Sequence, residues 1–230
     1  MLHELLGLSL EDRQIVSICG GGGKTTLLYA LARESKGVRN TTIYTTTNIF
    51  VPDESDIEFV EPFSPGEACS VWDRGNIVCA GSRIPEVNKL AAPDENAMQW
   101  LLQHSDGIYI EADGSKRLPL KYPAAWEPVP MAGSDAILVV AGLSALEMKR
   151  ETVVHRAFLA EQEIDYREPF VTEEGMARLL WAGYGRFNPV FVLNQADNAD
   201  IEEKGQRIAE RLIEYGARRA VVLALNNLYT

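Results

Sequence analysis

A run of four glycines follows an apolar stretch near the start of the chain and leads directly into Lys24 and Thr25. Glycine loses more backbone freedom on folding than any other residue, so such a run is costly to order. A loop that wraps a phosphate chain needs such glycines, because several N–H groups must approach the phosphate oxygens and a Cβ would block them. The run therefore predicts a phosphate-binding loop between a strand and a helix. Its members are Gly20, Gly21, Gly22 and Gly23.

The residues after the glycines supply the other parts of a nucleotide site. A helix that begins near Lys24 directs the positive end of its dipole at the phosphates. Lys24 is placed to reach the terminal phosphates and act in catalysis, the Thr25 hydroxyl to ligate Mg²⁺, and Thr26 to bond the α-phosphate. We expect GTP or ATP with Mg²⁺, and a Lys24 side chain near solvent without them. The alternative is a plain strand-to-helix turn, because the first glycine of the G-x-x-x-x-G-K-[ST] pattern falls at Ile18.

Two acidic residues end a predicted strand in the segment GIYIEADGSKRLPLK, residues 107–121. Phosphoryl-transfer sites hold Mg²⁺ with a carboxylate at the end of a neighbouring strand. Glu111 and Asp113 are two positions apart, so they share one side of the strand if it continues that far. Both are candidate metal ligands, and Asp113 is also a candidate catalytic base. The spacing leaves open which of them serves the metal, and a pair of solvated acids is the alternative.

Three cations follow within six residues, at Lys116, Arg117 and Lys121. They stand out in a chain whose net charge is −11. Lysine and arginine side chains bind phosphates and carboxylates, so this segment is a candidate clamp for an anionic substrate. A solvated loop that balances local charge is an equal alternative.

A later predicted strand ends in Asn194, Gln195, Ala196 and Asp197. This order resembles the Asn-Lys-x-Asp with which GTPases read guanine, with Gln195 in place of the lysine. Asn194 and Asp197 are therefore candidate base-contacting residues, and guanine is favoured over adenine. The alternative is a polar loop at a strand end, where Asn and Asp are common.

The alternation of apolar runs and turn residues predicts an α/β fold that is P-loop NTPase-like, with a mostly parallel sheet flanked by helices. We expect residues 1–230 to form one nucleotide-binding domain with ligands at the carboxyl ends of the strands. Residues 51–81 are rich in Pro, Gly, Asp and Glu, with short strand-like pieces at residues 56–60 and 76–80, and predict a small irregular insertion that could hold a hairpin. The predicted strands are residues 13–19, 41–46, 107–111, 136–141, 189–193 and 220–225, and the predicted helices are residues 24–36, 93–104, 172–181 and 201–215.

Composition excludes several function classes. The net charge of −11 repels nucleic acid and anionic membranes, so we expect neither as a partner. No apolar run reaches the ~18 residues that a bilayer span needs, and the first residues do not form a secretory signal. The three cysteines form no Cys-x-x-Cys pair and the three histidines lie far apart, which favours a cytoplasmic protein without an imidazole or thiolate metal site.

Taken together, these motifs resemble the YqeC family over about residues 14–197. The segments that carry the resemblance are GGGGKTTLLYALA, TTTNIF, EADGSKRLPLKYPAAWEP, VVAGLSAL, VHR and VLNQAD, and EADGS followed by LPLK is the most specific. The family is described as selenium cofactor biosynthesis proteins, or accessory proteins of selenium-dependent molybdenum hydroxylases. The resemblance implies a P-loop nucleotide-binding protein that acts in maturation of such an enzyme. It implies partners among molybdopterin, selenium species and the hydroxylase itself.

Three functions agree with these motifs. The first is a nucleoside-triphosphate hydrolase whose loop changes signal to a client enzyme, since phosphoryl transfer needs mainly positioning and electrostatics. The second is a phosphoryl- or nucleotidyl-transferase whose acceptor is a small pterin or selenium compound. The third is a nucleotide-gated chaperone without significant turnover. The sequence favours the first.

Overall fold

The structure is a computed structural model that describes residues 1–52 and 55–228. The chain divides into two compact units. The first consists of residues 1–18, 25–113 and 129–136, and the second consists of residues 19–24, 114–128 and 137–230. One nucleotide-binding domain over residues 1–230 stays a prediction.

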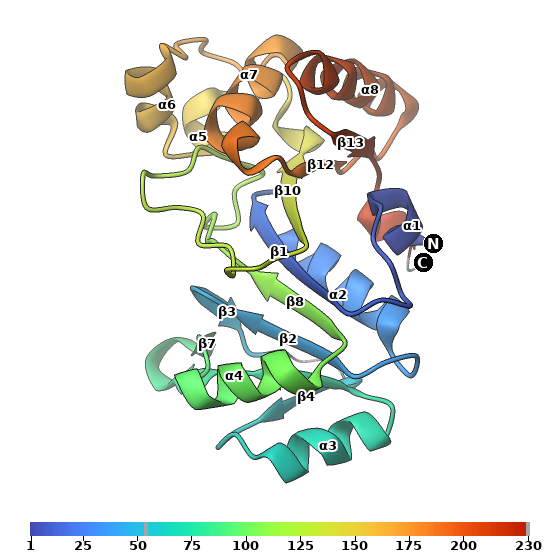
Figure 1. The fold of residues 1–230 in the computed structure, drawn as a ribbon. Coiled ribbons are helices and arrows are strands. Elements are labelled where there is room, and N and C mark those ends of the chain that lie inside the picture. The colour runs from blue at the N-terminus through green and yellow to red at the C-terminus, as the bar shows by residue number, and fades with distance from the viewer. Residues whose placement is uncertain (53–54, 229–230) are drawn as a thin grey trace. The chain divides into compact units, whose positions relative to one another are not determined.

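The first unit is built on a parallel sheet whose strands lie in the order β1, β8, β2, β5, β4 (Figure 1). In the register, Ile18 of β1 and Thr45 of β2 both lie opposite Glu111 of β8. The carboxyl ends of three neighbouring strands therefore meet at one edge, where α/β proteins bind their ligands. The bounds are Gln14–Gly20 for β1, Thr41–Thr45 for β2, Ile57–Val60 for β4, Ile77–Ala80 for β5 and Gly107–Glu111 for β8.

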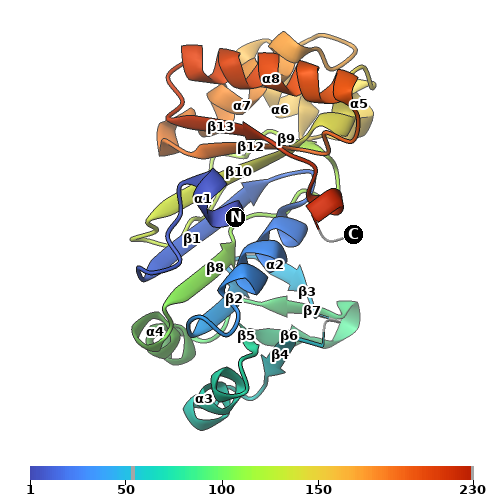
Figure 2. The same ribbon diagram turned by 90° about the vertical axis from the view of Figure 1, so that its right-hand side faces the viewer.

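Helices cover both faces of this sheet. On one face, Val71 of α3 and Leu101 of α4 pack into a core with Tyr44. On the opposite face lies α2, where the Ser35 hydroxyl is 2.5 Å from the hydroxyl of Tyr109 (Figures 1 and 2). The helices are α1 (Leu2–Leu6), α2 (Lys24–Ser35), α3 (Pro65–Asp73) and α4 (Glu95–His104), and a three-stranded antiparallel sheet is formed by β3 (Asn48–Phe50), β6 (Ser82–Ile84) and β7 (Lys89–Ala91), with a 3₁₀ turn at Pro85–Val87.

The prediction of an irregular insertion at residues 51–81 is wrong. In this stretch β4 and β5 are parallel neighbours in the main sheet of the unit, and α3 connects them. Pro65 begins α3 because the first helical position needs no N–H, and the Ser64 hydroxyl accepts a hydrogen bond from the Glu67 amide. Residues that signal loops therefore start a helix here. The strand-like pieces expected at residues 56–60 and 76–80 are strands, but the pairing of β5 with β2 places them in the main parallel sheet of the unit rather than in a hairpin.

The second unit has its own parallel strands in the order β10, β12, β13. Against β13 packs α8, which also contacts α7 (Figure 2). Side-chain caps start both helices, since Thr172 accepts from the Gly175 amide and Asn198 accepts from the Ile201 amide. The bounds are β10 (Ala136–Gly142), α5 (Arg150–Val153), α6 (Ala157–Ile164), α7 (Glu173–Tyr184), β12 (Val190–Asn194), α8 (Ala199–Glu214) and β13 (Arg219–Val222), with 3₁₀ turns at Leu143–Ala145, Gly185–Phe187 and Leu225–Leu228.

A small parallel pair in this unit, β9 (Leu120–Lys121) and β11 (Val154–His155), is not predictable from the sequence pattern because each strand has two residues. It sets Lys121 opposite His155. Two segments that the sequence singles out separately are thus brought side by side.

The predicted α/β class with a mostly parallel sheet flanked by helices is confirmed. A specific P-loop NTPase likeness stays a prediction. Within residues 1–52 and 55–228, no helix has the length and apolar character that a membrane span requires. Besides α3, the sequence prediction missed α1, α5, α6 and the two small sheets.

Candidate functional site

The glycine loop connects β1 to α2 in a backbone conformation that side chains rarely adopt. Gly20, Gly22 and Gly23 have φ values of 97°, 75° and 123°. A Cβ on Gly20 would lie 2.2 Å from the Val140 carbonyl oxygen, and one on Gly22 would lie 2.3 Å from the Gly142 nitrogen. Close packing of the loop on its own unit therefore requires glycine, whatever else the loop binds.

Two amides of the loop donate to the protein itself. The Gly21 amide donates to the Val140 carbonyl at 2.8 Å, and the Gly22 amide donates to the Leu118 carbonyl at 3.2 Å. In this conformation the middle of the glycine run therefore does not present these two amides to an anion.

The side chain of Lys24 is turned back over the loop. Its ammonium donates to the Gly20 carbonyl at 2.9 Å and to the Ser115 hydroxyl at 3.4 Å. Lys24 is only 5% exposed, so the expectation of a side chain near solvent is wrong. The reason is that these oxygens satisfy the ammonium within the unit, which the local sequence does not reveal.

In the first unit, the residue after Lys24 reaches the acidic strand end. The Thr25 hydroxyl donates to the Glu111 carboxylate at 2.8 Å across 86 positions of sequence. The main-chain carbonyl of Glu111 accepts from the Thr45 hydroxyl at 2.9 Å. Asp113 is fully buried two residues further on. The structure therefore brings Thr25 and Glu111 together, which two separate motifs predict.

These oxygens are of the kind that Mg²⁺ binds. Within the residues that the structure describes, no group of three or more His, Cys, Asp or Glu is placed to hold a metal ion. Magnesium in nucleotide sites is held by one or two protein oxygens, with water and substrate phosphates completing the shell. The Thr25 hydroxyl and the Glu111 carboxylate fit that pattern, and they do not fit a metal held by protein alone.

A family model described as YqeC protein matches residues 16–158, which is more than half of the chain. The chain belongs to the YqeC family. It is 32% identical over 157 residues to "Uncharacterized protein YqeC" from Escherichia coli (strain K12). That match covers 62% of the chain and 57% of the relative, so the chain spans little more than half the length of the curated relative.

The YqeC match includes the glycine loop, Glu111 and Asp113, and it ends before Asn194. In the structure the side-chain nitrogen of Asn194 donates a hydrogen bond to the Gly22 carbonyl at 2.9 Å. Its side-chain oxygen accepts one from the main-chain amide of Leu225 at 3.0 Å. Both polar ends of Asn194 are thus used to hold the glycine loop and the C-terminal segment. Asp197 is exposed beyond the strand end, and base reading by these two residues stays a prediction.

The three cations of the YqeC motif differ in their surroundings. Lys116 and Arg117 are exposed, with φ values of 51° and 64°. Lys121 is buried, and its ammonium donates to the Gly114 carbonyl at 2.7 Å and lies 2.9 Å from the Glu127 carboxylate. Lys121 therefore supports the loop from inside, while Lys116 reaches its surface. Their role as a substrate clamp stays a prediction.

Sequence reasoning missed Ser115, Glu127 and Arg156. Ser115 contacts Lys24, and the Glu127 carboxylate pairs with both Lys121 and Arg156. Burial acts to raise the pKa of Glu127, but the hydrogen bonds and charge of Lys121 and the bond to Arg156 lower it overall. All three lie in segments that carry the family resemblance, Ser115 and Glu127 in EADGSKRLPLKYPAAWEP and Arg156 in VHR, but nothing in those segments shows which groups they contact.

Proposed function

We propose that this protein binds a nucleoside triphosphate with Mg²⁺ and hydrolyses it slowly. The observation that carries the proposal is the hydrogen bond from Thr25 to Glu111, because it joins the helix start after the glycine loop to an acidic strand end. The same pair of groups serves Mg²⁺ and its phosphate oxygens in phosphoryl-transfer sites. In a chain of net charge −11, such a local device is needed to hold a polyanion.

Each protein group has a defined part in the proposed reaction. Lys24 would exchange the neutral oxygens of Gly20 and Ser115 for a phosphate oxygen, because hydrogen bonds between ions are the stronger ones. Thr25 and Glu111 would hold Mg²⁺, which neutralises charge on the phosphates during transfer. Asp113, which is buried and follows the same strand, would orient the attacking hydroxyl or water.

The proposed context is maturation of a selenium-dependent molybdenum hydroxylase or of its molybdopterin or selenium cofactor. It rests on membership of the YqeC family. We propose the cytoplasm as the compartment, with the hydroxylase or a small cofactor precursor as the partner. A strain that lacks the gene and carries a Lys24→Ala copy should then lose hydroxylase activity, whereas a Lys149→Ala copy should restore it.

A transferase is the second candidate, and one contact favours it. The loop that bears Ser115, against Lys24, continues into Lys116 and Leu118, which line a pocket in the same unit. A small acceptor in that pocket would lie beside the loop that contacts the catalytic lysine. Product analysis separates the two functions, because hydrolysis releases inorganic phosphate without an acceptor and transfer does not.

Calorimetry tests the nucleotide site directly. GTP, ATP and CTP are titrated with and without Mg²⁺ into the wild-type protein, Lys24→Ala and Lys149→Ala. We expect Mg²⁺-dependent binding in the wild type and in Lys149→Ala, an exposed-lysine control, and its loss in Lys24→Ala. Circular dichroism must show that Lys24→Ala is folded, since this side chain is buried. Tight Mg²⁺–nucleotide binding by a folded Lys24→Ala protein would contradict the assigned role.

A further inference from the structure

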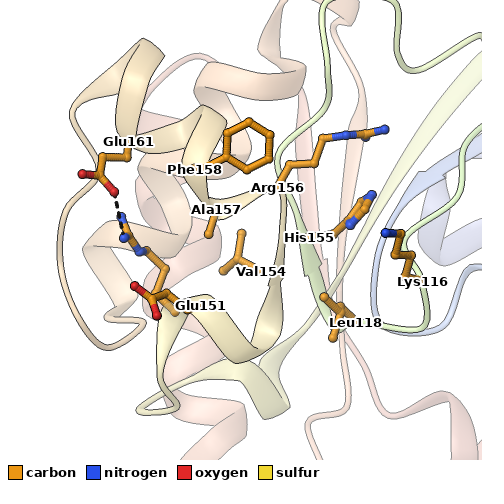
Figure 3. A pocket seen from close by; sticks show the side chains of 10 residues that line it. Lys116, Leu118, Glu151, Val154, His155, Arg156, Ala157, Phe158 and Glu161 are labelled. Atoms are coloured by element: carbon orange, nitrogen blue, oxygen red, sulfur yellow. Dashed lines mark hydrogen bonds and ion pairs between the residues drawn. The ribbon is translucent and has the colours of Figure 1, made fainter.

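The second unit contains a pocket of about 620 Å³ between the loop 116–118 and helices α5 and α6 (Figure 3). One end is cationic, and there the side chains of Lys116 and His155 point toward each other (Figure 3). Glu151 and Glu161, which pairs with Arg150, lie at the other end (Figure 3). The pocket therefore has one end suited to an anion and one that is not.

The cationic end has more positive than negative charge. The Glu127 carboxylate pairs with both Lys121 and Arg156. Lys116 also acts on His155 as a positive charge. This end therefore suits a ligand that carries negative charge, such as a phosphomonoester.

The positive charge around His155 affects the pKa of its ring. Burial, together with the positive charges of Arg156, Lys121 and Lys116, lowers the pKa of His155 to about 4, against the opposite effect of Glu127. The ring is therefore neutral at pH 7 and offers one N–H donor without adding charge. A bound anion would reverse the unfavourable field at this ring.

The backbone holds the cations in an uncommon conformation. Lys116 and Arg156 have φ values of 51° and 63°, in the left-handed region that favours glycine. Non-glycine residues in this region are strained, and such strain is concentrated at ligand sites. Both residues flank His155 from different segments of the unit.

The middle of the pocket is apolar. Leu118, Val154 and Ala157 line it, and the Phe158 ring stands beside it with 61% of the residue exposed. A ring this exposed has apolar area to contribute to a ligand. The space beyond the cationic end therefore suits a flat apolar group better than a second charged one.

We propose that this pocket is a second ligand site that binds an organic phosphate, a phosphomonoester that carries a flat apolar body. The phosphate would lie against Lys116, His155 and Arg156, and the apolar body against Phe158 and Val154. This site goes beyond the proposed nucleotide site and does not rest on it. Within the second unit, the loop 115–118 contacts Lys24 and also lines the pocket.

Phenyl phosphate is a suitable probe, with His155 as the local reporter. The chain has three histidines, so imidazole NMR signals are few, and His155→Gln assigns the relevant one. We expect phenyl phosphate to shift the His155 signal saturably and to raise its pKa from about 4, because an anion favours the protonated ring. Phenol, which has the ring without the phosphate, should do neither.

Two variants separate the parts of the site. Lys116→Gln should weaken phenyl phosphate binding roughly tenfold, the scale of one lost charged hydrogen bond. Phe158→Ala should weaken phenyl phosphate binding and leave inorganic phosphate binding unchanged. Lys149→Gln, an exposed lysine outside the pocket, is the matched control and should bind as the wild type does.

A further test uses a variant that removes Lys24 from the glycine loop. In Lys24→Ala, phenyl phosphate should still shift His155, whether or not nucleotide binding survives. Binding that leaves His155 unshifted, or that Lys24→Ala abolishes and Lys116→Gln does not, would place the phosphate in the glycine loop and overturn the second site. Equal losses in Lys116→Gln and Lys149→Gln would overturn it too, since they would show only general charge attraction.

Discussion

The ammonium of Lys24 lies 3.4 Å from the hydroxyl of Ser115, which immediately precedes the pocket residue Lys116. Leu118 lies three positions after Ser115 in the same loop, and its carbonyl accepts a hydrogen bond from the Gly22 amide. The glycine loop and the cationic pocket are thus supported by one short segment.

Thr25→Val tests the magnesium site. The change removes one hydroxyl and keeps the shape of the side chain, so we expect the affinity for Mg²⁺–nucleotide to fall about tenfold, or about 1.4 kcal/mol. Metal-free nucleotide should bind as before. Calorimetry with and without Mg²⁺ measures both. Thr26→Val is the matched control, because Thr26 is assigned to phosphate rather than metal; an equal loss of Mg²⁺ dependence in both variants would contradict the assignment of Thr25.

Gly23→Ala tests the packing of the loop. A Cβ at this position would lie 2.4 Å from the Asn194 side-chain nitrogen, on a backbone with φ of 123°. We expect the free energy of unfolding to fall by about 1–3 kcal/mol. Gly114→Ala is the control, because nothing lies within 4 Å of its added Cβ, and it should change stability by less than about 1 kcal/mol. Urea denaturation gives both values, and similar losses would refute this packing.

Asn194→Ala should destabilise the protein. It leaves the Gly22 carbonyl and the Leu225 amide without their partner, and such a loss is worth about 1–3 kcal/mol in a buried place. Urea denaturation of the variant and the wild type measures this loss. A fully stable variant would show that these two hydrogen bonds do not hold the loop.

Asp197→Ala tests base reading. The residue is exposed, so stability should stay within about 0.5 kcal/mol of the wild type. If Asp197 contacts the base, the preference among GTP, ATP and CTP should weaken in calorimetric titrations. Unchanged relative affinities would exclude it from the base site.

Acidification should weaken the fold before carboxylates titrate. The pKa of His155 lies at about 4 in the folded protein, whereas an unfolded histidine has a pKa of about 6.5. Between these values the unfolded chain binds more protons, so the free energy of unfolding falls as the pH is lowered from about 6.5 toward 4. The stabilisation is complete above about pH 6.5. Burial also lowers the pKa of His3, which adds to the same trend.

Urea denaturation at several pH values measures this dependence. His155→Gln should flatten the change between about pH 6.5 and 4.5, because glutamine does not titrate. His104→Gln, an exposed histidine that stacks on Trp100, is the control and should retain the wild-type slope. Identical slopes in the wild type and His155→Gln would show that His155 is not held neutral by its surroundings.

Residues 51–81 show where sequence patterns are insufficient. The composition of this stretch is that of a loop, yet it supplies two strands and a helix to the first unit. Strand-like pieces can be recognised at residues 56–60 and 76–80, but strands of four residues carry too little pattern to show which strands they pair with. In contrast, α2 and β8 were predictable, because a longer apolar pattern and a glycine stop mark the helix and a buried apolar run marks the strand.

The site shows the same division. Spacing along the chain predicted that Thr25 and an acidic residue at a strand end would lie close together, because parallel strands end at one edge of the sheet. Spacing could not predict that Lys24 folds back onto Gly20, or that Lys121 lies buried beside Glu127. These arrangements depend on partners many positions away.

The sequence by itself determined the α/β class, the glycine loop at a helix start and the YqeC relationship, because these follow from local periodicity and short motifs. Only the tertiary structure decided which of the cations are buried, that the Glu127 carboxylate is shared, and that His155 faces Lys116. The physical reason is that burial and electrostatic fields arise from groups distant in sequence, whose distances are set only when the strands and helices pack.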